Sequence, residues 1–487
     1  MNKTLFTIIG YVVFIGYTCG IMGLGTLIEK KTKIDKTVCR KLTHIFSALI
    51  WIICYFFFGC SIHWVILNGV GAVALGVVVF GNLMDTYERD DAKKSYGLFF
   101  IGFATFITAL ISFLLGKETY LYTGIAYYCL ALGDGLAPLV AKLLKKHNPK
   151  IMEGRTLFGS LTVFIISFLC TLAFSLIFGM ELSPLFMLSV AGLTTSAEFY
   201  GLKGLDNLFI DFSVFGYLLL YHYGYVSTVL QVVLLVTPFI AFLAIGTKSL
   251  TVSGGIFGLL LFYLVGFFGR GAVPVLFVVI MFTVGTVVSF ITSRLYNRRA
   301  GVTPVKHGRT GKQIAAVGLA AVICLIVYYF TDITLFYALY FLSITEQFAD
   351  SMASDIGRLT KGKNVDIIRF KAVEKGLSGG ISLLGTACAL LGSVVLALVP
   401  FLFRIIEINY FLVLAAIAFA GTLIDSVLGS LCQALYECGT CGALTENKTH
   451  CNANTRLVKG VSWIDNTAVN FLTSFLTCGV GCLMLLL

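Results

Sequence analysis

Long apolar stretches alternate with short polar segments along the whole chain, beginning with residues 5–28. A helix needs roughly 20 apolar residues to cross a bilayer, and about sixteen stretches of that length can be laid along this sequence. The pattern therefore predicts an all-α, polytopic membrane protein with about sixteen transmembrane helices.

The segments between the predicted spans differ in length and charge on the two sides of the membrane. Every second one is longer and basic, namely residues 29–41, 85–95, 142–155, 201–207, 247–251, 294–311, 351–376 and 432–462. Of the 35 Lys and Arg residues, all except Lys3, Lys117, Arg270 and Arg404 lie in or beside these segments. Such an asymmetry is typical of cytoplasmic loops. It predicts an integral, multi-pass membrane protein whose active sites face the cytoplasm.

Composition supports a membrane protein and argues against a nucleic-acid partner. Hydrophobic residues make up 58% of the chain and charged residues 12%, against about 25% charged residues in soluble proteins. The net charge of +11 is explained by topology signals beside anionic headgroups. We therefore expect the lipid bilayer as a partner and no nucleic acid.

The predicted second span opens with Arg40, Lys41 and His44. Arg40 and His44 are four residues apart and share a helix face. Cations at a helix start oppose the helix dipole, so an anion is expected beside them. The alternative is that these residues only anchor the helix on the inner side.

The motif Gly133-Asp134-Gly135 interrupts the apolar stretch 120–142. An Asp inside the membrane is costly and usually functional. The glycines let backbone N–H groups approach a phosphate, and the carboxylate can hold a divalent ion. Pro138 then frees backbone groups in the helix. The alternative is a structural Asp paired with a lysine.

A basic segment follows and leads into the next apolar stretch. Lys142, Lys150 and Arg155 precede Gly159-Ser160 at the start of that stretch, a pattern that favours anion binding at a helix N-terminus. Further along, Glu198 and then Asp206-Asn207 mark the membrane edge and suit metal and phosphate. Taken alone, Asp206-Asn207 can equally be a turn with an Asx cap.

In order and spacing, these motifs resemble the phytol kinase and dolichol kinase family, whose nucleotide motif is similar to that of CDP-diacylglycerol synthases. The resemblance covers roughly the first 200 residues. It implies phosphorylation of a membrane isoprenoid alcohol, with CTP as donor and Mg²⁺. It implies catalytic roles for Asp134, Glu198 and Asp206, with Asp134 as the Mg²⁺ ligand. The implied nucleotide- and phosphate-binding residues are Arg40, Lys41, His44, Gly133, Gly135, Lys142, Lys150, Arg155, Gly159, Ser160 and Asn207. The sequence departs from the family at Phe158, where Glu is usual.

A second set of motifs begins with Glu346 and Asp350 at the end of an apolar stretch, followed by Asp355. The first two are i, i+4 on one helix face, where two carboxylates repel unless a cation lies between them. This spacing favours a divalent metal, with lysine pairing as the alternative. Asp425 lies deep in another apolar run, where an unpaired carboxylate is expensive.

Two helix starts in the same half carry polar residues. Ser378-Gly379-Gly380 follows Arg369 and Lys375, which suits phosphate binding or, alternatively, close helix packing through small residues. The last span begins at Asp465-Asn466, with Asn470 on the same face. Asp465 is either a ligand or the cap of that helix.

These stretches, in order, resemble the phytyl-phosphate kinase family of integral membrane proteins. The resemblance implies conversion of an isoprenyl monophosphate to the diphosphate with a nucleoside triphosphate. It implies catalytic roles for Asp350, Asp425 and Asp465. The implied Mg²⁺ ligands are Glu346, Asp350, Asp355, Asp425 and Asp465. The implied phosphate-binding residues are Arg309, Ser354, Arg369, Lys375, Ser378, Gly379, Gly380, Asn466 and Asn470.

Cys438, Cys441, His450 and Cys451 cluster in the last basic segment. Cys-x-x-Cys with a later His/Cys pair is typical of a structural zinc site. The adjacency of His450 and Cys451 argues against a complete tetrahedral shell. The alternatives are that these cysteines carry out redox chemistry or that they bind no metal.

Together the motifs predict two fused helical bundles, an alcohol kinase domain at 1–225 and an isoprenyl-phosphate kinase domain at 226–487. The chain would salvage a prenyl alcohol such as phytol or geranylgeraniol as the diphosphate. Two alternatives come from other classes. A CTP-dependent lipid cytidylyltransferase would use a similar Asp-centred site, and a transporter of anionic substrates would also bury carboxylates and arginines.

Overall fold

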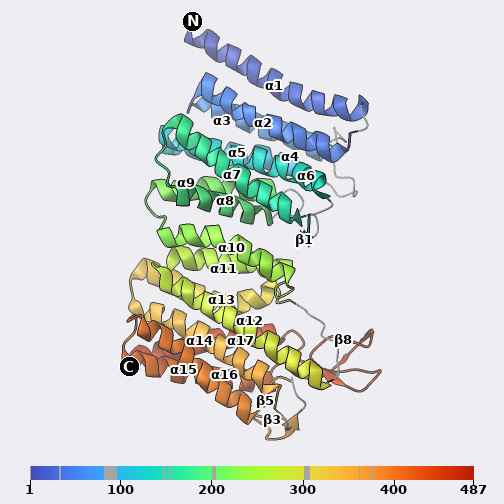
Figure 1. Cartoon of the computed structure of the whole chain (residues 1–487), viewed down its shortest axis with the longest axis vertical. Coiled ribbons are helices and arrows are strands. Elements are labelled where there is room, and N and C mark those ends of the chain that lie inside the picture. The colour runs from blue at the N-terminus through green and yellow to red at the C-terminus, as the bar shows by residue number, and fades with distance from the viewer. Residues whose placement is uncertain are drawn as a thin grey trace. The chain divides into compact units, whose positions relative to one another are not determined.

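The computed structural model of the 487-residue chain describes residues 2–31, 34–81, 96–145, 148–152, 155–199, 205–300, 308–360, 362, 364–373 and 377–486. The chain divides into two compact units, Met1–Phe242 and Leu243–Leu487 (Figure 1). Each unit is described by itself.

Helices make up nearly all of the first unit. In chain order its elements are α1 (Lys3–Lys31), α2 (Lys36–Phe58), α3 (Ile62–Phe80), α4 (Gly97–Leu115), the turn η2 (Lys117–Thr119), α5 (Tyr120–Tyr128), the π-helical turn η3 (Cys129–Asp134), α6 (Gly135–Leu143), β1 (Lys150–Met152), β2 (Arg155–Thr156), α7 (Leu157–Phe178), α8 (Pro184–Phe199), α9 (Leu205–His222) and α10 (Thr228–Gly246). β1 and β2 form an antiparallel pair.

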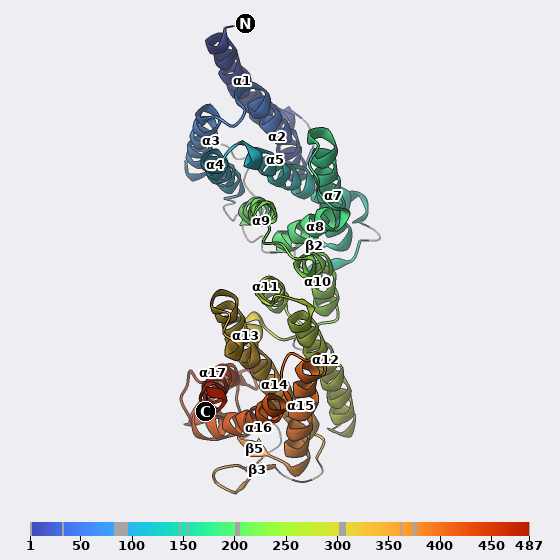
Figure 2. The same cartoon turned by 90° about the vertical axis from the view of Figure 1, so that its left-hand side faces the viewer.

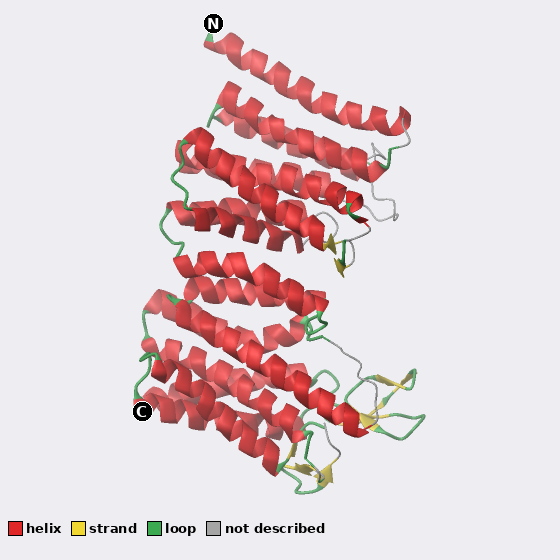
Figure 3. Cartoon of the chain, viewed as in Figure 1, coloured by secondary structure: helices red, strands yellow, loops and turns green. Residues whose placement is uncertain are grey.

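The second unit combines helices with short strands. Its elements are α11 (Val252–Phe268), α12 (Ala272–Ala300), α13 (Gly311–Thr331), α14 (Thr334–Gly357), β3 (Asn364–Asp366), β4 (Ala372–Val373), β5 (Gly380–Ile381), α15 (Leu383–Leu402), α16 (Ile408–Leu431), β6 (Leu435–Glu437), β7 (Leu444–Thr445), β8 (Thr449–His450), β9 (Ala453–Asn454), β10 (Arg456–Lys459) and α17 (Asn466–Leu486). The strands form the antiparallel sheets β4-β3-β5, β10-β6-β7 and β8-β9. All of them lie in the connections at one end of the helices (Figure 3).

The lengths of the helices confirm the all-α, polytopic prediction. Among the described residues, twelve helical stretches are long and apolar enough to cross a membrane, with Lys117–Leu143 counted as one. The helices α8, α9, α11 and α14 are shorter or more polar and pack among them.

The bundle of the first unit has an apolar exterior and buries hydroxyl groups among its apolar core residues. Leu176 is 75% exposed on the outer face of α7, where lipid rather than water must solvate it. On the neighbouring α8, by contrast, the hydroxyls of Thr194, Thr195 and Ser196 are buried and donate to carbonyls one turn earlier, at 2.8–2.9 Å. Small residues and self-satisfied hydroxyls let helices pack closely where no hydrophobic effect drives them together.

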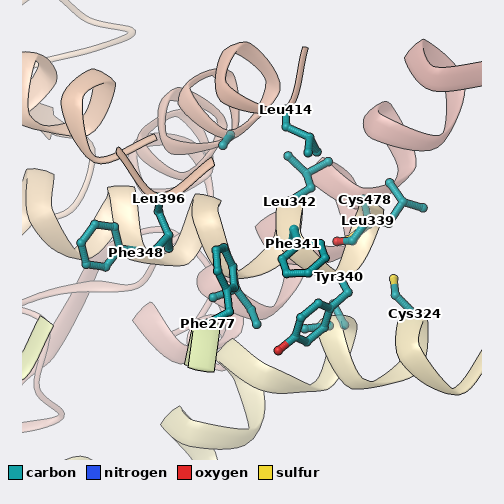
Figure 4. Packing of buried hydrophobic residues seen from close by; sticks show 14 of the residues in the cluster. Phe277, Cys324, Leu339, Tyr340, Phe341, Leu342, Phe348, Leu396, Leu414 and Cys478 are labelled. Carbon is teal, nitrogen blue, oxygen red and sulfur yellow. The ribbon is translucent and has the colours of Figure 1, made fainter. Parts of the chain in front are cut away.

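The core of the second unit forms around α14. This helix packs against α12, α13, α15, α16 and α17, and Figure 2 shows it among its neighbours. Tyr340 and Phe341 are fully buried, and Phe341 meets Phe277 edge to face at 4.9 Å (Figure 4). The Tyr340 hydroxyl donates to the carbonyl of Pro274 at 2.6 Å, so the ring brings no unsatisfied polar group into the core. This packing fixes α14, the helix that carries Glu346 and Asp350.

Gly192 allows α8 and α10 to touch. A Cβ at Gly192 would lie 2.2 Å from the carbonyl oxygen of Leu234, which is backbone and cannot move aside cheaply. We predict that Gly192→Ala lowers the midpoint of thermal unfolding in detergent, because overpacking costs about 1–3 kcal/mol. The matched control is Gly216→Ala on α9, where nothing lies within 4 Å of the added methyl. Equal midpoints for the two variants would contradict this close approach.

Candidate functional site

Asp134 is held by the start of α2. Lys41 Nζ donates to Asp134 Oδ2 at 2.5 Å, and His44 Nδ1 lies 3.4 Å from the same oxygen. A second contact of Lys41 depends on Pro138. Because Pro138 has no N–H to donate to the Asp134 carbonyl one turn earlier, that carbonyl can accept from Lys41 Nζ, at 3.1 Å. Asp134 also closes the π-helical turn η3, an irregularity often found at functional sites.

Arg155 joins two carboxylates from neighbouring helix ends. Its guanidinium donates to Glu198 Oε1 at 2.7 Å and to Asp206 Oδ2 at 3.0 Å. Glu198 lies near the end of α8 and Asp206 near the start of α9, and both are buried. Burial alone would lower the pKa of the Arg155 guanidinium, but the two carboxylates raise it well above its ordinary value. Arg155 therefore stays charged and fixes both acids.

The two arrangements form one electrostatic unit, which we call the first-unit cluster. Its members are Lys41, His44, Asp134, Arg155, Glu198 and Asp206. Asp134 interacts electrostatically with both Arg155 and Glu198. Two buried atoms of this cluster, His44 Nε2 and Asp134 Oδ1, have no hydrogen-bond partner among the residues that the structure describes. Buried polar atoms are nearly always satisfied, so these two atoms mark where a ligand would bind.

The remaining residues predicted for this half take several places. Lys142 pairs with Asp35 at 2.9 Å on the surface, and Lys150 lies exposed on β1. The Asn207 side chain donates to the Gly97 carbonyl at 2.9 Å. Ser160 is buried beside Glu198, with which it shares a hydrogen bond. The others lie on the elements named here: Arg40 on α2, Gly133 in η3, Gly135 on α6 and Gly159 on α7.

Asp211 is a buried carboxylate that the motif search passed over. It is fully buried on α9 and accepts the Thr108 hydroxyl at 3.3 Å through Oδ2, while Oδ1 has no hydrogen-bond partner within the described ranges. The signal was in the sequence, since Asp211 lies within an apolar helix just as Asp134 does. It also acts electrostatically on Cys129, which lies in the same π-helical turn η3 as Asp134.

Three carboxylates gather in the second unit on α14 and α16. Glu346 is fully buried, while Asp350 and Asp425 are half-buried. Each of the two aspartates repels Glu346, and they repel each other. Among the described residues, no Lys or Arg forms an ion pair with any of the three. We call these three residues the second-unit cluster.

Neutral side chains of α14 and α17 support the second-unit cluster. Gln347 Nε2 donates to Glu346 Oε2 at 2.9 Å and to Ser474 Oγ at 2.7 Å. The Thr473 hydroxyl donates to Asp425 Oδ2 at 3.2 Å. Glu346 Oε1 and Asn470 Oδ1 are buried and have no hydrogen-bond partner in the described part of the chain. Close carboxylates with open lone pairs and neutral neighbours form an environment that suits a divalent cation.

Other predicted residues of this half lie outside that cluster. Asp355 is buried on α14 and interacts electrostatically with Asp350. Asp465 is exposed and accepts the Ala468 N–H at 2.9 Å, as a cap of α17 does, and Asn466 is exposed beside it. Ser354 and Arg369 are exposed, Arg309 pairs through its backbone with Leu250, and Lys375 lies outside the described residues.

The Ser378-Gly379-Gly380 segment is anchored by two carboxylates that the motif search did not select. Ser378 N–H donates to Glu446 at 2.8 Å. Gly379 packs against Ser430, whose hydroxyl lies 2.8 Å from both oxygens of Asp366. Asp366 also accepts the N–H groups of Ile368 and Arg369, as an Asx turn does, at 3.0 and 2.9 Å. The segment is thereby held at the end of α16.

The cysteine cluster comes together in the connection between α16 and α17. One ligand atom from each of Cys438, Cys441, His450 and Cys451 lies within 4.8 Å of all the others. His450 Nδ1 is 3.4 Å from Cys441 Sγ and 3.3 Å from Cys451 Sγ, and the two sulfurs are 3.8 Å apart.

Comparison with known proteins places the second unit in a family. Residues 235–478, half of the chain, match the family described as Integral membrane protein DUF92. The chain is 31% identical over 143 residues to Protein PGR of Arabidopsis thaliana, covering 26% of this chain and 49% of that protein. It is 35% identical over 92 residues to Uncharacterized membrane protein MJ0933 of Methanocaldococcus jannaschii, covering 19% of this chain and 38% of that protein. The chain thus spans less than half the length of these relatives, and no solved structure matches it.

Asp366 makes stability depend on pH. Burial by itself would raise the pKa of Asp366, but its hydrogen bonds and the nearby Lys459 bring it below the ordinary value. A depressed carboxyl pKa stabilises the fold above the ordinary value near 3.9, and this stabilisation is lost as the pH falls through the folded-state pKa. We predict that Asp366→Asn lowers the free energy of unfolding by about 1–3 kcal/mol at pH 7. The difference in this free energy between the variant and the wild type should shrink below pH 4.

Thermal unfolding in detergent across pH 3–7 measures this difference. The control is Glu181→Gln, an exposed carboxylate in the connection between α7 and α8. A difference of the same size at every pH would contradict the role of the Asp366 charge.

Proposed function

The chain belongs to the integral membrane protein DUF92 family, and we propose that it is a membrane-lipid phosphotransferase with one active site in each unit. The first unit would phosphorylate an isoprenoid alcohol, and the second would convert the monophosphate to the diphosphate. A nucleoside triphosphate, CTP by the resemblance of the motifs, would be the donor. The basic connections favour active sites that face the cytoplasm.

The first-unit cluster carries this proposal. It sets three carboxylates, two cations and a histidine at the ends of helices whose outer faces are apolar. A reaction between an alcohol in the bilayer and a nucleotide in water needs charged groups at the boundary between the membrane and the solvent. Phosphoryl transfer is mostly a matter of positioning and charge neutralisation, and fixed, buried charges serve both purposes.

In the first unit, the alcohol oxygen forms a bond to the γ-phosphorus while the bond to the nucleoside diphosphate breaks. The hydroxyl proton needs an acceptor. Glu198 and Asp206 are both engaged by Arg155. His44 is better placed, since with its Nδ1 proton directed at Asp134 it presents a free lone pair at buried Nε2. Lys41 and Arg155 would balance the phosphate charge.

Mg²⁺ fits the donor atoms of both units. In the first unit, Asp134 Oδ1 is buried and open. In the second unit, Glu346, Asp350 and Asp425 offer oxygens with no cation paired to them among the described residues. When bound there, Mg²⁺ would neutralise charge on the nucleotide phosphates. Asp134 would hold Mg²⁺ in the first unit, and Glu346, Asp350 and Asp425 would hold it in the second.

In the second unit, an oxygen of the lipid monophosphate attacks the γ-phosphorus, and the nucleoside diphosphate leaves. A deprotonated monophosphate oxygen needs no general base. Carboxylates as metal ligands, with no histidine on α14, α16 or α17, are consistent with that simpler requirement. Within the Ser378-Gly380 segment at the end of α16, Glu446 already accepts the Ser378 N–H and the Leu377 carbonyl accepts the Gly380 N–H, so the Gly379 N–H is the group that would contact a phosphate.

Incubation of membranes with γ-labelled CTP and a panel of prenyl alcohols tests the function. Label on the lipid, resolved into mono- and diphosphate, is expected. Label released as free diphosphate would instead favour the cytidylyltransferase. Uptake of an anion into liposomes without nucleotide consumption would favour the transporter.

We predict that Asp134→Asn and Asp350→Asn separate the two steps. Asp134→Asn should reduce alcohol phosphorylation by about a hundredfold or more but spare conversion of a supplied monophosphate. Asp350→Asn should do the reverse, so that monophosphate accumulates. Asp332→Asn, exposed and outside both clusters, should change neither step. Loss of both steps in either folded variant would refute two independent sites.

We predict that His44→Gln lowers kcat for the alcohol by about 10²- to 10⁴-fold, the usual contribution of a general base, with little change in KM for CTP. The second step should be unaffected. His63→Gln is the matched control, because His63 lies at the start of α3 and contacts Tyr11. If His44→Gln raised KM for CTP at constant kcat, His44 would bind phosphate and not accept the proton.

A further inference from the structure

Four potential metal ligands that belong to neither cluster meet in the connection between α16 and α17. A tetrahedral zinc site with Zn–S of about 2.3 Å and Zn–N of about 2.0 Å requires S···S distances near 3.8 Å and S···N distances near 3.5 Å. The Cys441 and Cys451 sulfurs are 3.8 Å apart, and His450 Nδ1 lies 3.4 and 3.3 Å from them. Cys438 Sγ lies within the same 4.8 Å group. The distances are those of one coordination shell.

The backbone explains how two adjacent residues can serve one ion. β8 and β9 form a hairpin whose two-residue loop is Cys451-Asn452. Both loop residues have positive φ, 50° and 56°, which is the conformation of a type I′ turn. Cys451 therefore turns back, and its sulfur reaches the side where His450 Nδ1 lies. Sequence adjacency alone argued against this arrangement.

The other two ligands lie on a second hairpin. Cys438 follows β6, and Gly442, with a φ of +70°, returns the chain toward β7 by donating to the Cys438 carbonyl at 2.8 Å. The Cys438 sulfur also lies 3.7 Å from the His450 carbonyl oxygen, so the two hairpins meet at this ligand.

We propose that Cys438, Cys441, His450 and Cys451 form a structural zinc site, with three thiolates and imidazole Nδ1 as ligands. Thiolate ligands select zinc and related soft metals over Mg²⁺ or Ca²⁺. All four positions are filled by the protein, which marks a structural site, since catalytic zinc keeps one position open.

The zinc would clamp the β8-β9 hairpin to the β6-β7 hairpin, which is itself paired with β10. Their strands are two or three residues long, and Cys441 and Cys451 are exposed. Isolated hairpins of this size are marginally stable. Glu446, between β7 and β8, anchors Ser378 N–H at 2.8 Å. The zinc site therefore fixes the residue that holds the glycine-rich segment.

Metal analysis of the full chain tests the site. The protein is purified in detergent with reductant, and about one zinc per chain is expected. Cys438→Ser and Cys441→Ser should lose it, while Cys432→Ser, in the same connection but outside the cluster, should keep it. Zinc at well under one per chain in the wild type, or retained by both cluster variants, overturns the proposal.

Cobalt substitution needs no variant and covers the case in which the variants misfold. Wild-type protein stripped by a chelator and refilled with Co²⁺ should show the intense ligand-field and thiolate charge-transfer bands of a tetrahedral site. Absence of these bands, or a Cys441–Cys451 disulfide in reduced preparations without metal, refutes the site.

Hydrogen exchange tests the link to the glycine-rich segment. Removing the metal should speed exchange in residues 377–381 severalfold and leave the connection between α13 and α14 unchanged. Unchanged exchange at 377–381 would refute the clamp. Zinc content and exchange are measured without substrate, so failure here is distinct from failure of the phosphotransferase.

Discussion

The Lys41–Asp134 pair is the interaction on which the first unit depends. An ionised carboxylate inside a helix bundle is tolerated only with a compensating charge and satisfied lone pairs. Pro138 creates the opportunity by leaving the Asp134 carbonyl open, and one ammonium then satisfies both the carbonyl and a carboxylate oxygen. This contact ties α2 to η3 and directs the second carboxylate oxygen into the site. Arg155 does the same for α8 and α9.

The two units solve the problem of buried carboxylates differently. In the first unit, each acid of the cluster has a cation from the protein. In the second, Glu346, Asp350 and Asp425 are supported by an amide and hydroxyls from α14 and α17. Repulsion among three such groups destabilises the apo bundle unless protons or a cation are bound. The second unit therefore has the stronger electrostatic reason to bind a divalent ion.

Packing makes these sites rigid. Around α14, aromatic and aliphatic side chains fill the interior, and the polar end of that helix is presented by a well-packed core. In the first unit, small and hydroxyl-bearing residues bring helices into contact, with Gly192 against Leu234 as the tightest case described here. Preorganised charges need such a frame, because a site that relaxes around its ligand loses electrostatic advantage.

The sequence alone determined what is local or one-dimensional. Apolar length set the membrane class, and the high cost of charge in apolar runs identified Asp134, Glu346 and Asp425 as residues of interest. The i, i+4 spacing put Glu346 and Asp350 on one face, and Pro138 predicted an open carbonyl. Asp211 followed the same rule and could have been found in the same way.

Only the tertiary structure decided which groups meet. Arg155, expected to bind phosphate, is engaged by Glu198 and Asp206, which lie 43 and 51 residues away. Asp366 and Glu446 gained roles as anchors of the glycine-rich segment, and a turn at Cys451 united ligands that adjacency seemed to separate. The physical reason is that pairing energy depends on distances of a few ångströms between distant segments. Those distances are set by helix packing and turn conformation, which composition and spacing do not specify.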